Sequence, residues 1–265
     1  MQSDNFISGM IKIKKEHLLK DAPELAGKTA LVFAFPYYTQ TALLCMGVYA
    51  QIPDYHIWVR KKLEAVASRL CEKNPYLELR AYVDNSPINE KLLALDAGIG
   101  VMGKNNLLIT EKYGSYIFLG ELVVMQGILE DFPDWLPNAE KAALNCEECG
   151  KCVRACPSGA LDGRFNKEIC VSRLTQKKGE LSQKEQNLIK KSGFIWGCDR
   201  CQNVCPSNKV LQHVSFDGRL GKDFLNDIEN LSNDEYKTKY GEYAFVWRGR
   251  ETMLRNLRIL FGEKR

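Results

Sequence analysis

The chain has 265 residues, of which 45% are hydrophobic and 26% charged, a composition typical of a folded protein with one large or two modest domains. No apolar run approaches the roughly 20 residues that span a bilayer, and the first residues lack a secretory signal, so we expect a cytoplasmic protein with no membrane partner. The net charge of +4 does not by itself indicate a nucleic acid partner.

The first part of the chain alternates predicted strands with predicted helices. The apolar run from Thr29 to Phe35 predicts a strand that is buried on both faces, and the helical spacing of apolar residues from Asp54 to Leu70 predicts a helix. Apolar and polar residues alternate from Leu77 to Val83, which predicts a strand that ends at Asp84. These elements favour an α/β or α+β domain.

The next stretch predicts a helix, a glycine-rich loop and two strands. Ser86 and Pro87 have the residue types of a helix N-cap and first helical position, and the helix should continue to about Ala97. The loop AGIGVMGKNN follows, and strands are expected around 107–110 and 116–125. The loop does not fit the dinucleotide fingerprint because it follows a helix, and it is not a P-loop because Asn105 follows Lys104.

Three features of this first part are candidates for chemistry. Asp84 stands at the predicted carboxyl end of a strand, where open α/β sheets place active groups, although the residues alone favour a local cap or turn as the explanation of a carboxylate there. His56 is expected in the first turn of a helix, either as a structural residue or as an imidazole whose charged form the helix dipole disfavours. The glycine-rich loop could present backbone N–H groups and Lys104 to a phosphate or to an amide-rich cofactor.

Eight of the ten cysteines predict iron–sulfur clusters. The first four have the spacing Cys-x2-Cys-x2-Cys-x3-Cys-Pro, the bacterial ferredoxin signature in which the fourth thiolate ligates a second 4Fe-4S cluster. A second group, Cys-x2-Cys-x3-Cys-Pro, supplies three thiolates, and a lone cysteine between the groups completes eight. Zinc is the alternative, because Cys-x2-Cys pairs also suit a tetrahedral zinc ion. We assign one cluster to Cys146, Cys149, Cys152 and Cys205, and the other to Cys156, Cys170, Cys198 and Cys201.

The remaining segments complete the expected domain organisation. Pro133 and Pro137 indicate a linker, and helices are expected to open at Ser232 and to cover 253–260. Cys45 and Cys71 lie among apolar residues and are interpreted as packing residues. The sequence therefore predicts an α+β protein with a mixed α/β core over residues 1–140, a bacterial-ferredoxin-like double 4Fe-4S domain over 141–215 and a helical segment over 216–265 that packs on the core.

Basic residues gather in the C-terminal tail and in the segment after the lone cysteine. Such groups could contact phosphate, but solvated helical faces have the same composition, and we favour the solvated faces. The tail carries Arg248, Arg250, Arg255, Arg258, Lys264 and Arg265, and the segment carries Lys177, Lys178, Lys184, Lys190 and Lys191.

Taken in chain order, several stretches resemble the epoxyqueuosine reductase family, and they cover most of the chain from residue 30 onward. Both cysteine groups are part of the resemblance. The other stretches are YAQIPDYHIWVRKKL from Tyr49, AYVDNSPINEK from Ala81, AGIGVMGKNNLLIT from Ala97, GSYIFLGEL from Gly114, GCDRCQNVCPSN from Gly197 and LSNDEYKTKYGEYAFVWRGRETMLRNLRIL from Leu231.

The resemblance implies an oxidoreductase that uses cobalamin and two 4Fe-4S clusters. Its reaction would remove the epoxide oxygen of epoxyqueuosine at the wobble position of tRNA, with electrons from an external low-potential donor. The first domain would then be a catalytic, cobalamin-binding domain with Asp84 as proton donor, a role open to a carboxyl group whose pKa is raised by burial beside the corrin. By resemblance, the residues near the cobalamin are His56, Gly100, Gly103, Lys104 and Asn105.

The chain also departs from the family pattern. Val101 and Met102 stand where the family usually has a tryptophan and a small polar residue. Family members end in a helical-repeat domain that helps to hold tRNA, whereas this chain stops at Arg265, which leaves tRNA binding open. Two rival hypotheses are a corrinoid iron–sulfur reductase of another small organic substrate and a ferredoxin-like electron carrier without catalysis.

Overall fold

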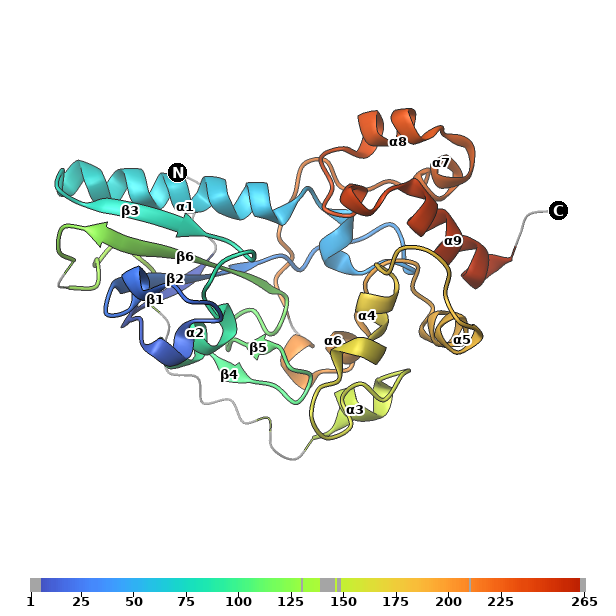
Figure 1. Cartoon of the computed structure of the whole chain (residues 1–265), viewed down its shortest axis with the longest axis horizontal. Coiled ribbons are helices and arrows are strands. Elements are labelled where there is room, and N and C mark those ends of the chain that lie inside the picture. Colours follow the sequence, from blue (N-terminus) through green and yellow to red (C-terminus); the bar gives the residue numbers. More distant parts are fainter. Residues whose placement is uncertain (1–5, 130, 139–145, 147–148, 210, 263–265) are drawn as a thin grey trace. The chain divides into compact units, whose positions relative to one another are not determined.

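The computed structural model describes residues 6–129, 131–138, 146, 149–209 and 211–262, which group into two compact units (Figure 1). Unit 1 contains the described residues of Met1–Tyr37, Tyr55–Gly103 and Leu107–Cys146, and unit 2 contains those of Tyr38–Asp54, Lys104–Asn106 and Glu147–Arg265. The domain boundaries expected after residues 140 and 215 remain predictions. Part of the expected linker, residues 139 and 140, lies outside the described residues.

Unit 1 is built on an antiparallel sheet of four strands. The strand order is β1-β2-β6-β3, and every neighbouring pair is antiparallel. The predicted strand at 29–35 is buried along its whole length, as its continuous apolar sequence requires for a strand in the middle of a sheet covered on both faces. The strands are β1 (Ile7–Lys12), β2 (Thr29–Pro36), β3 (Glu78–Tyr82) and β6 (Ile117–Gln126).

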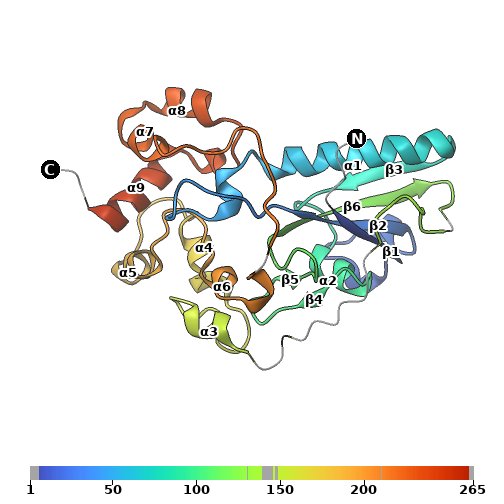
Figure 2. The same cartoon turned by 180° about the vertical axis from the view of Figure 1, so that it is seen from behind.

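Two helices cover opposite faces of this sheet (Figures 1 and 2). Helix α1 (Tyr55–Lys73) buries Val59 and Leu63 against the face that includes Gly120, where a Cβ atom would come within 2.9 Å of Val59. Helix α2 (Glu90–Asp96) packs on the other face, where its Leu93 joins Val123 in one core cluster. The remaining elements of unit 1 are the hairpin of β4 (Val101–Met102) and β5 (Leu108–Ile109) and short 3-10 helices at Lys15–His17 and Pro23–Leu25.

The start of α2 differs from the sequence prediction. The Ser86 side chain accepts the N–H of Ile88, two residues on, and so closes a turn. Asn89 is the N-cap instead, and its side chain accepts the N–H of Leu92. The chain from Asp84 to Asn89 is therefore a loop that leads into α2.

Unit 2 is helical in its described residues. Its core is a cluster of large apolar side chains that includes Trp196, Phe224, Tyr236 and Phe245. The fully buried Asn256 donates hydrogen bonds to the carbonyl groups of Thr175 and Ile195, and so ties the last helix to distant segments. The helices are α3 (Lys151–Ala155), α4 (Val171–Leu174), α5 (Gln183–Ser192), α6 (Arg200–Asn203), α7 (Phe224–Asn230), α8 (Asn233–Tyr240) and α9 (Arg250–Phe261), with 3-10 helices at Val48–Gln51, Lys167–Ile169, Pro206–Asn208 and Val246–Arg248.

The basic segment after Cys170 contains a capped helix, α5. Ser182 and Glu185 form a capping box at its start, and Gly193 ends it with a φ of 77°. The predicted helix starting at Ser232 is confirmed as α8, which has the same type of capping box. No helix in the described part of the chain is long and apolar enough to cross a membrane.

Candidate active site and cluster ligands

Asp84 has an unusual backbone conformation directly after β3. Its φ of 56° lies in the left-handed region, where non-glycine residues are uncommon and where strain often accompanies function. Two hydrogen bonds hold the loop: the N–H of Asp84 donates to Glu90 Oε1 at 2.5 Å, and its carbonyl accepts the N–H of Ser86 at 2.5 Å. The sheet is antiparallel, so the rule for parallel α/β sheets does not account for this position.

The Asp84 side chain meets two donors from the first turn of α1. The Tyr55 hydroxyl donates to Asp84 Oδ2 at 2.9 Å, and His56 Nε2 lies 3.1 Å from the same oxygen. The side chains of His56 and Asp84 are 37% and 54% exposed, so both can reach a ligand in solution. The structure therefore brings together two of the side chains that the sequence singled out and adds Tyr55.

The hydrogen bond from His56 lowers the pKa of Asp84 below its ordinary value, against the opposing effect of burial, and Tyr55 adds to the decrease. Asp84 is therefore an anion at neutral pH in this conformation. The expected rise in pKa is absent here, because an imidazole and a hydroxyl stabilise the carboxylate while half of the side chain is still hydrated.

Two further acids near Asp84 were not identified from the sequence. Burial raises the pKa of Glu90 to about 7, and the negative charge of Asp84 contributes to the increase. Glu121 on β6 is fully buried, and within the described residues neither of its carboxyl oxygens has a hydrogen-bond partner. A glutamate inside an apolar strand, GELVV, was the sequence signal that could have found the second of these.

Aromatic rings form a stack beside Asp84 in unit 1. Tyr37 and Phe118 stack with ring centroids 4.2 Å apart, Tyr55 stacks on Phe118 at 4.5 Å, and His56 stacks on Tyr55 at 4.0 Å. A partly exposed aromatic surface beside a carboxylate suits a flat, apolar ring system with polar edges. The residues present therefore fit a corrin, which is such a ring with amide side chains.

The glycine-rich loop has structural requirements of its own. A Cβ atom at Gly100 would lie 2.3 Å from the carbonyl oxygen of Ile109, so only glycine allows this approach within the β4–β5 hairpin. The N–H of Gly103 donates to the carbonyl of Leu107 at 2.8 Å and closes the hairpin turn. Lys104 and Asn105 belong to unit 2, so the loop residues predicted near the cobalamin are divided between the two units.

Electrostatic interactions connect four cysteines of unit 2. Cys198 interacts with Cys170 and Cys156, and Cys170 interacts with Cys156. Cys201 interacts with Cys198 and Cys170, and also with Cys152, which the sequence assigned to the other cluster. Apart from Cys152, these are the four ligands that the sequence assigned to one cluster, and they come from three separate segments. Among the described residues no group of three or more acidic, histidine or cysteine side chains is arranged to hold a single metal ion.

The sulfur atoms also receive backbone hydrogen bonds. Burial favours the neutral thiol of Cys156, but the hydroxyl of Ser158 and the N–H groups of Ser158, Ala160 and Leu161 lower its pKa overall. Burial raises the pKa of Cys170, although it too accepts backbone hydrogen bonds. N–H groups directed at a thiolate tune iron–sulfur clusters, so this donor set fits one.

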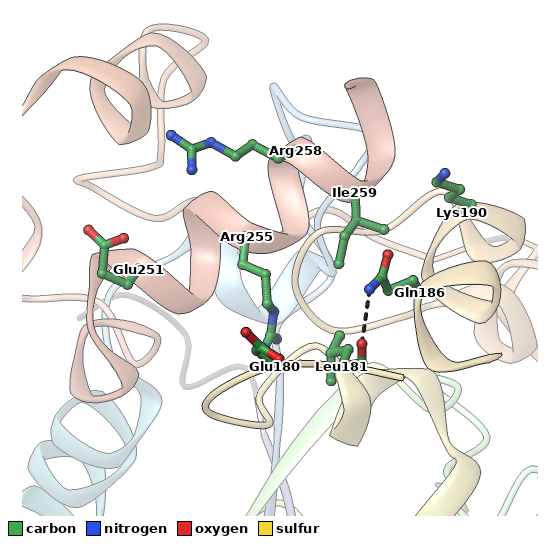
Figure 3. A pocket seen from close by; sticks show the side chains of 8 residues that line it. All are labelled: Glu180, Leu181, Gln186, Lys190, Glu251, Arg255, Arg258 and Ile259. Atoms are coloured by element: carbon green, nitrogen blue, oxygen red, sulfur yellow. Dashed lines mark hydrogen bonds between the residues drawn. The ribbon is translucent and has the colours of Figure 1, made fainter. Parts of the chain in front are cut away.

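Basic residues of the tail and of the α5 segment meet in unit 2. They line a cavity of about 580 Å³ between α5 and α9 that includes Lys190, Arg255 and Arg258 (Figure 3). Arg255 donates to the carbonyl groups of Lys177 and Gly179, whereas the side chain of Arg258 makes no hydrogen bond or ion pair with another described residue.

Two family models match the chain. Residues 25–85 match the model described as epoxyqueuosine reductase QueG, DUF1730, and residues 145–208 match a 4Fe-4S double cluster binding domain. The first match contains Tyr55, His56 and Asp84, and the second contains all eight predicted cluster ligands.

Named relatives agree with these models. The epoxyqueuosine reductase of Listeria monocytogenes is 35% identical over 226 residues, which cover 82% of this chain and 57% of the relative. The chain thus spans little more than half the length of the curated relatives it matches.

Solved structures have the same fold. Epoxyqueuosine reductase from Streptococcus thermophilus superimposes with a TM-score of 0.78 at 30% identity, over 94% of this chain and 68% of that one. An epoxyqueuosine reductase solved with an epoxyqueuosine-modified tRNA-Tyr stem loop has the same TM-score at 26% identity, over 97% of this chain and 76% of that one. The family uses 4Fe-4S clusters and cobalamin, and the donor sets described above fit both. This chain belongs to the epoxyqueuosine reductase family.

Proposed function

We propose that this protein reduces epoxyqueuosine in tRNA to queuosine. The observation that carries the proposal is the Asp84 carboxylate in a strained loop, held between the Tyr55 hydroxyl and the His56 imidazole. Removal of the epoxide oxygen consumes two electrons and two protons and releases an alkene and water. The clusters and cobalamin, when bound, supply the electrons, so the task left to the side chains is to bind the substrate and supply protons.

In this proposal Asp84 delivers a proton to the departing oxygen. In the free protein its carboxylate is stabilised by hydrogen bonds from His56 and Tyr55, so Asp84 takes up the proton that it delivers when the cofactor and substrate bind. Covering the half-exposed carboxyl with the cofactor and substrate would remove water and raise its pKa, which makes proton transfer to an oxyanion favourable. Tyr55 keeps the carboxyl oriented through its hydrogen bond.

We further propose that the clusters are held by the two sets of four cysteines assigned from the sequence, and that His56, Gly100, Gly103, Lys104 and Asn105 lie near the cobalamin. The mutual interactions of Cys156, Cys170, Cys198 and Cys201 support one of the two sets. We also propose that a soluble low-potential carrier supplies the electrons and that the protein acts in the cytoplasm.

The proposal is tested by converting epoxyqueuosine-containing tRNA with protein reconstituted with iron, sulfide and cobalamin. A low-potential reductant starts the reaction, and mass spectrometry of the nucleosides measures queuosine. Queuosine is expected from the wild-type protein and not from Asp84→Asn, which keeps the size of the side chain but cannot deliver the proton. Cobalamin binding without conversion would instead favour a corrinoid reductase of another substrate, and failure to bind cobalamin would favour an electron carrier.

A further inference from the structure

Glu121 is an acid buried where its charge has no compensation. Its register neighbours in the sheet are Val32 of β2 and Tyr82 of β3, and no described residue bonds to its carboxyl oxygens. Ionising a carboxyl group in such a place costs several kcal/mol, so the group stays protonated. Burial, and then the charge of Glu90, raises the pKa of Glu121 well above its ordinary value. Glu121 is therefore a neutral acid with a hydrogen to donate.

Glu90 is the acid that interacts electrostatically with Glu121. Side chains alternate along a strand, so Glu121 lies on the same face of β6 as Val123, and that face packs against Leu93 of α2. Glu90 is the first residue of α2. Two acids in one partly buried place do not ionise together, because the second charge would repel the first. With Glu121 neutral, Glu90 is the member of the pair that ionises, with a pKa of about 7.

The Glu90 carboxylate binds the backbone of Asp84. Oε1 of Glu90 accepts the Asp84 N–H at 2.5 Å, and this bond closes the loop in which Asp84 has its φ of 56°. An ionised acceptor makes a shorter and stronger hydrogen bond than a neutral one. The charged or titratable groups that face Glu90 are Asp84 after β3, His56 on α1, Lys91 on α2 and Glu121 on β6.

We propose that Glu90 and Glu121 are positioning residues for Asp84. Glu121 stays neutral beside Glu90, and the Glu90 carboxylate holds the Asp84 loop in the conformation in which the Asp84 side chain meets Tyr55 and His56. The consequence for turnover rests on the proposed function, whereas the consequences for loop opening and for protonation do not.

Hydrogen exchange tests the loop without any turnover. In Glu90→Ala, peptides that cover 84–89 should take up deuterium at least several-fold faster than in the wild type. Glu90→Gln should lie between the two, because its amide oxygen can still accept the Asp84 N–H. Glu64→Gln, an exposed acid on α1, is the matched control and should exchange as the wild type does. Equal uptake in Glu90→Ala and the wild type would overturn the proposal.

Infrared spectroscopy tests the neutral acid. At neutral pH the wild-type protein and Glu64→Gln should show a protonated carboxyl C=O band that Glu121→Gln lacks, and an unchanged band in Glu121→Gln would refute the assignment. In the conversion assay, Glu90→Ala should lose at least tenfold in kcat with little change in KM, and Glu90→Gln should lose the pH dependence near 7. If neither the wild-type protein nor any variant converts tRNA, the proposed function fails. The hydrogen-exchange and infrared results still test whether Glu90 and Glu121 position Asp84.

Discussion

Replacing Glu90 by glutamine should change how the stability of the protein depends on pH. Burial raises the pKa of Glu90 from an ordinary 4.5 to about 7 in the folded protein. Between these values the folded protein binds more protons than the unfolded chain, so wild-type stability falls as the pH rises from 4.5 to 7. Glutamine has no such titration, and the variant should therefore gain stability relative to the wild type as the pH rises.

The size of this relative gain follows from the two pKa values. At about 1.4 kcal/mol per pKa unit, the shift corresponds to about 3 kcal/mol at most. For a chain of this size that is a change of about 6–12 °C in the difference between the two melting temperatures. Groups that do not interact with Glu90 titrate equally in both proteins and cancel in the difference.

The measurement is thermal unfolding of anaerobic, cluster-loaded wild-type and Glu90→Gln protein at several pH values between about 5 and 7.5. Glu64→Gln, which replaces an exposed acid on α1 by the same residue type, is the matched control. Parallel melting curves of wild type and Glu90→Gln across this range would refute the reasoning, since Glu90 would then titrate at the same pH in the folded and unfolded states.

Three further predictions concern the proposed function. Asp84→Asn should abolish queuosine formation with unchanged iron content and cobalamin binding, and undiminished turnover would remove Asp84 as proton donor. Cys170→Ala should halve the iron content measured after reconstitution, whereas Cys71→Ala, whose thiol donates to a backbone carbonyl, should leave it unchanged. Replacing both Arg258 and Lys190 by glutamate should weaken binding of an anticodon stem loop. Titration at several salt concentrations should show that the salt dependence of the binding constant falls by up to about two phosphate contacts. An equal salt dependence in the variant and the wild type would show that this cavity does not contact RNA.

Regular hydrophobic patterns made much of the fold predictable. Three elements show their burial in their own sequence: β2 as an apolar run, α1 as helical spacing of apolar residues and β3 as alternation. The edge strand β1 was not predicted, because its sequence ISGMIK has no clear alternation. Its Gly9 is explained only by a distant segment: a Cβ atom there would lie 2.6 Å from the carbonyl oxygen of Ala97.

Local competition explains the error at the start of α2. Ser86 and Pro87 have the right residue types for a helix start, but the Ser86 hydroxyl closes a turn with Ile88. Asn89 then caps the helix three residues later. Because α2 starts later than predicted, the chain from Asp84 to Asn89 forms a loop in which the Asp84 side chain reaches α1. Ser86, which does not cap the helix, therefore helps to form the candidate active site.

The candidate site was predictable in part. His56 and Asp84 were singled out from their places at a helix start and a strand end, the family resemblance gave them roles, and the structure places their side chains 3.1 Å apart. Glu90 was missed because it looks like an ordinary surface acid when read alone, and Glu121 was missed although it stands inside an apolar strand. Their importance comes from the face of β6 that Glu121 occupies and from the bond between Glu90 and the Asp84 backbone, and both depend on the packing of α2 against the sheet.

The protonation of Asp84 depends on a balance between its environment and its partners. In the free protein the hydrogen bonds from His56 and Tyr55 outweigh burial, so the carboxyl is ionised. A ligand over the half-exposed side chain would increase the desolvation but leave both hydrogen bonds in place, and the pKa would then rise toward neutrality. An acid that gains its proton only when covered is ionised between turnovers and carries a proton only while the ligand is bound. The same covering would hold the proton beside the departing oxygen when it is needed.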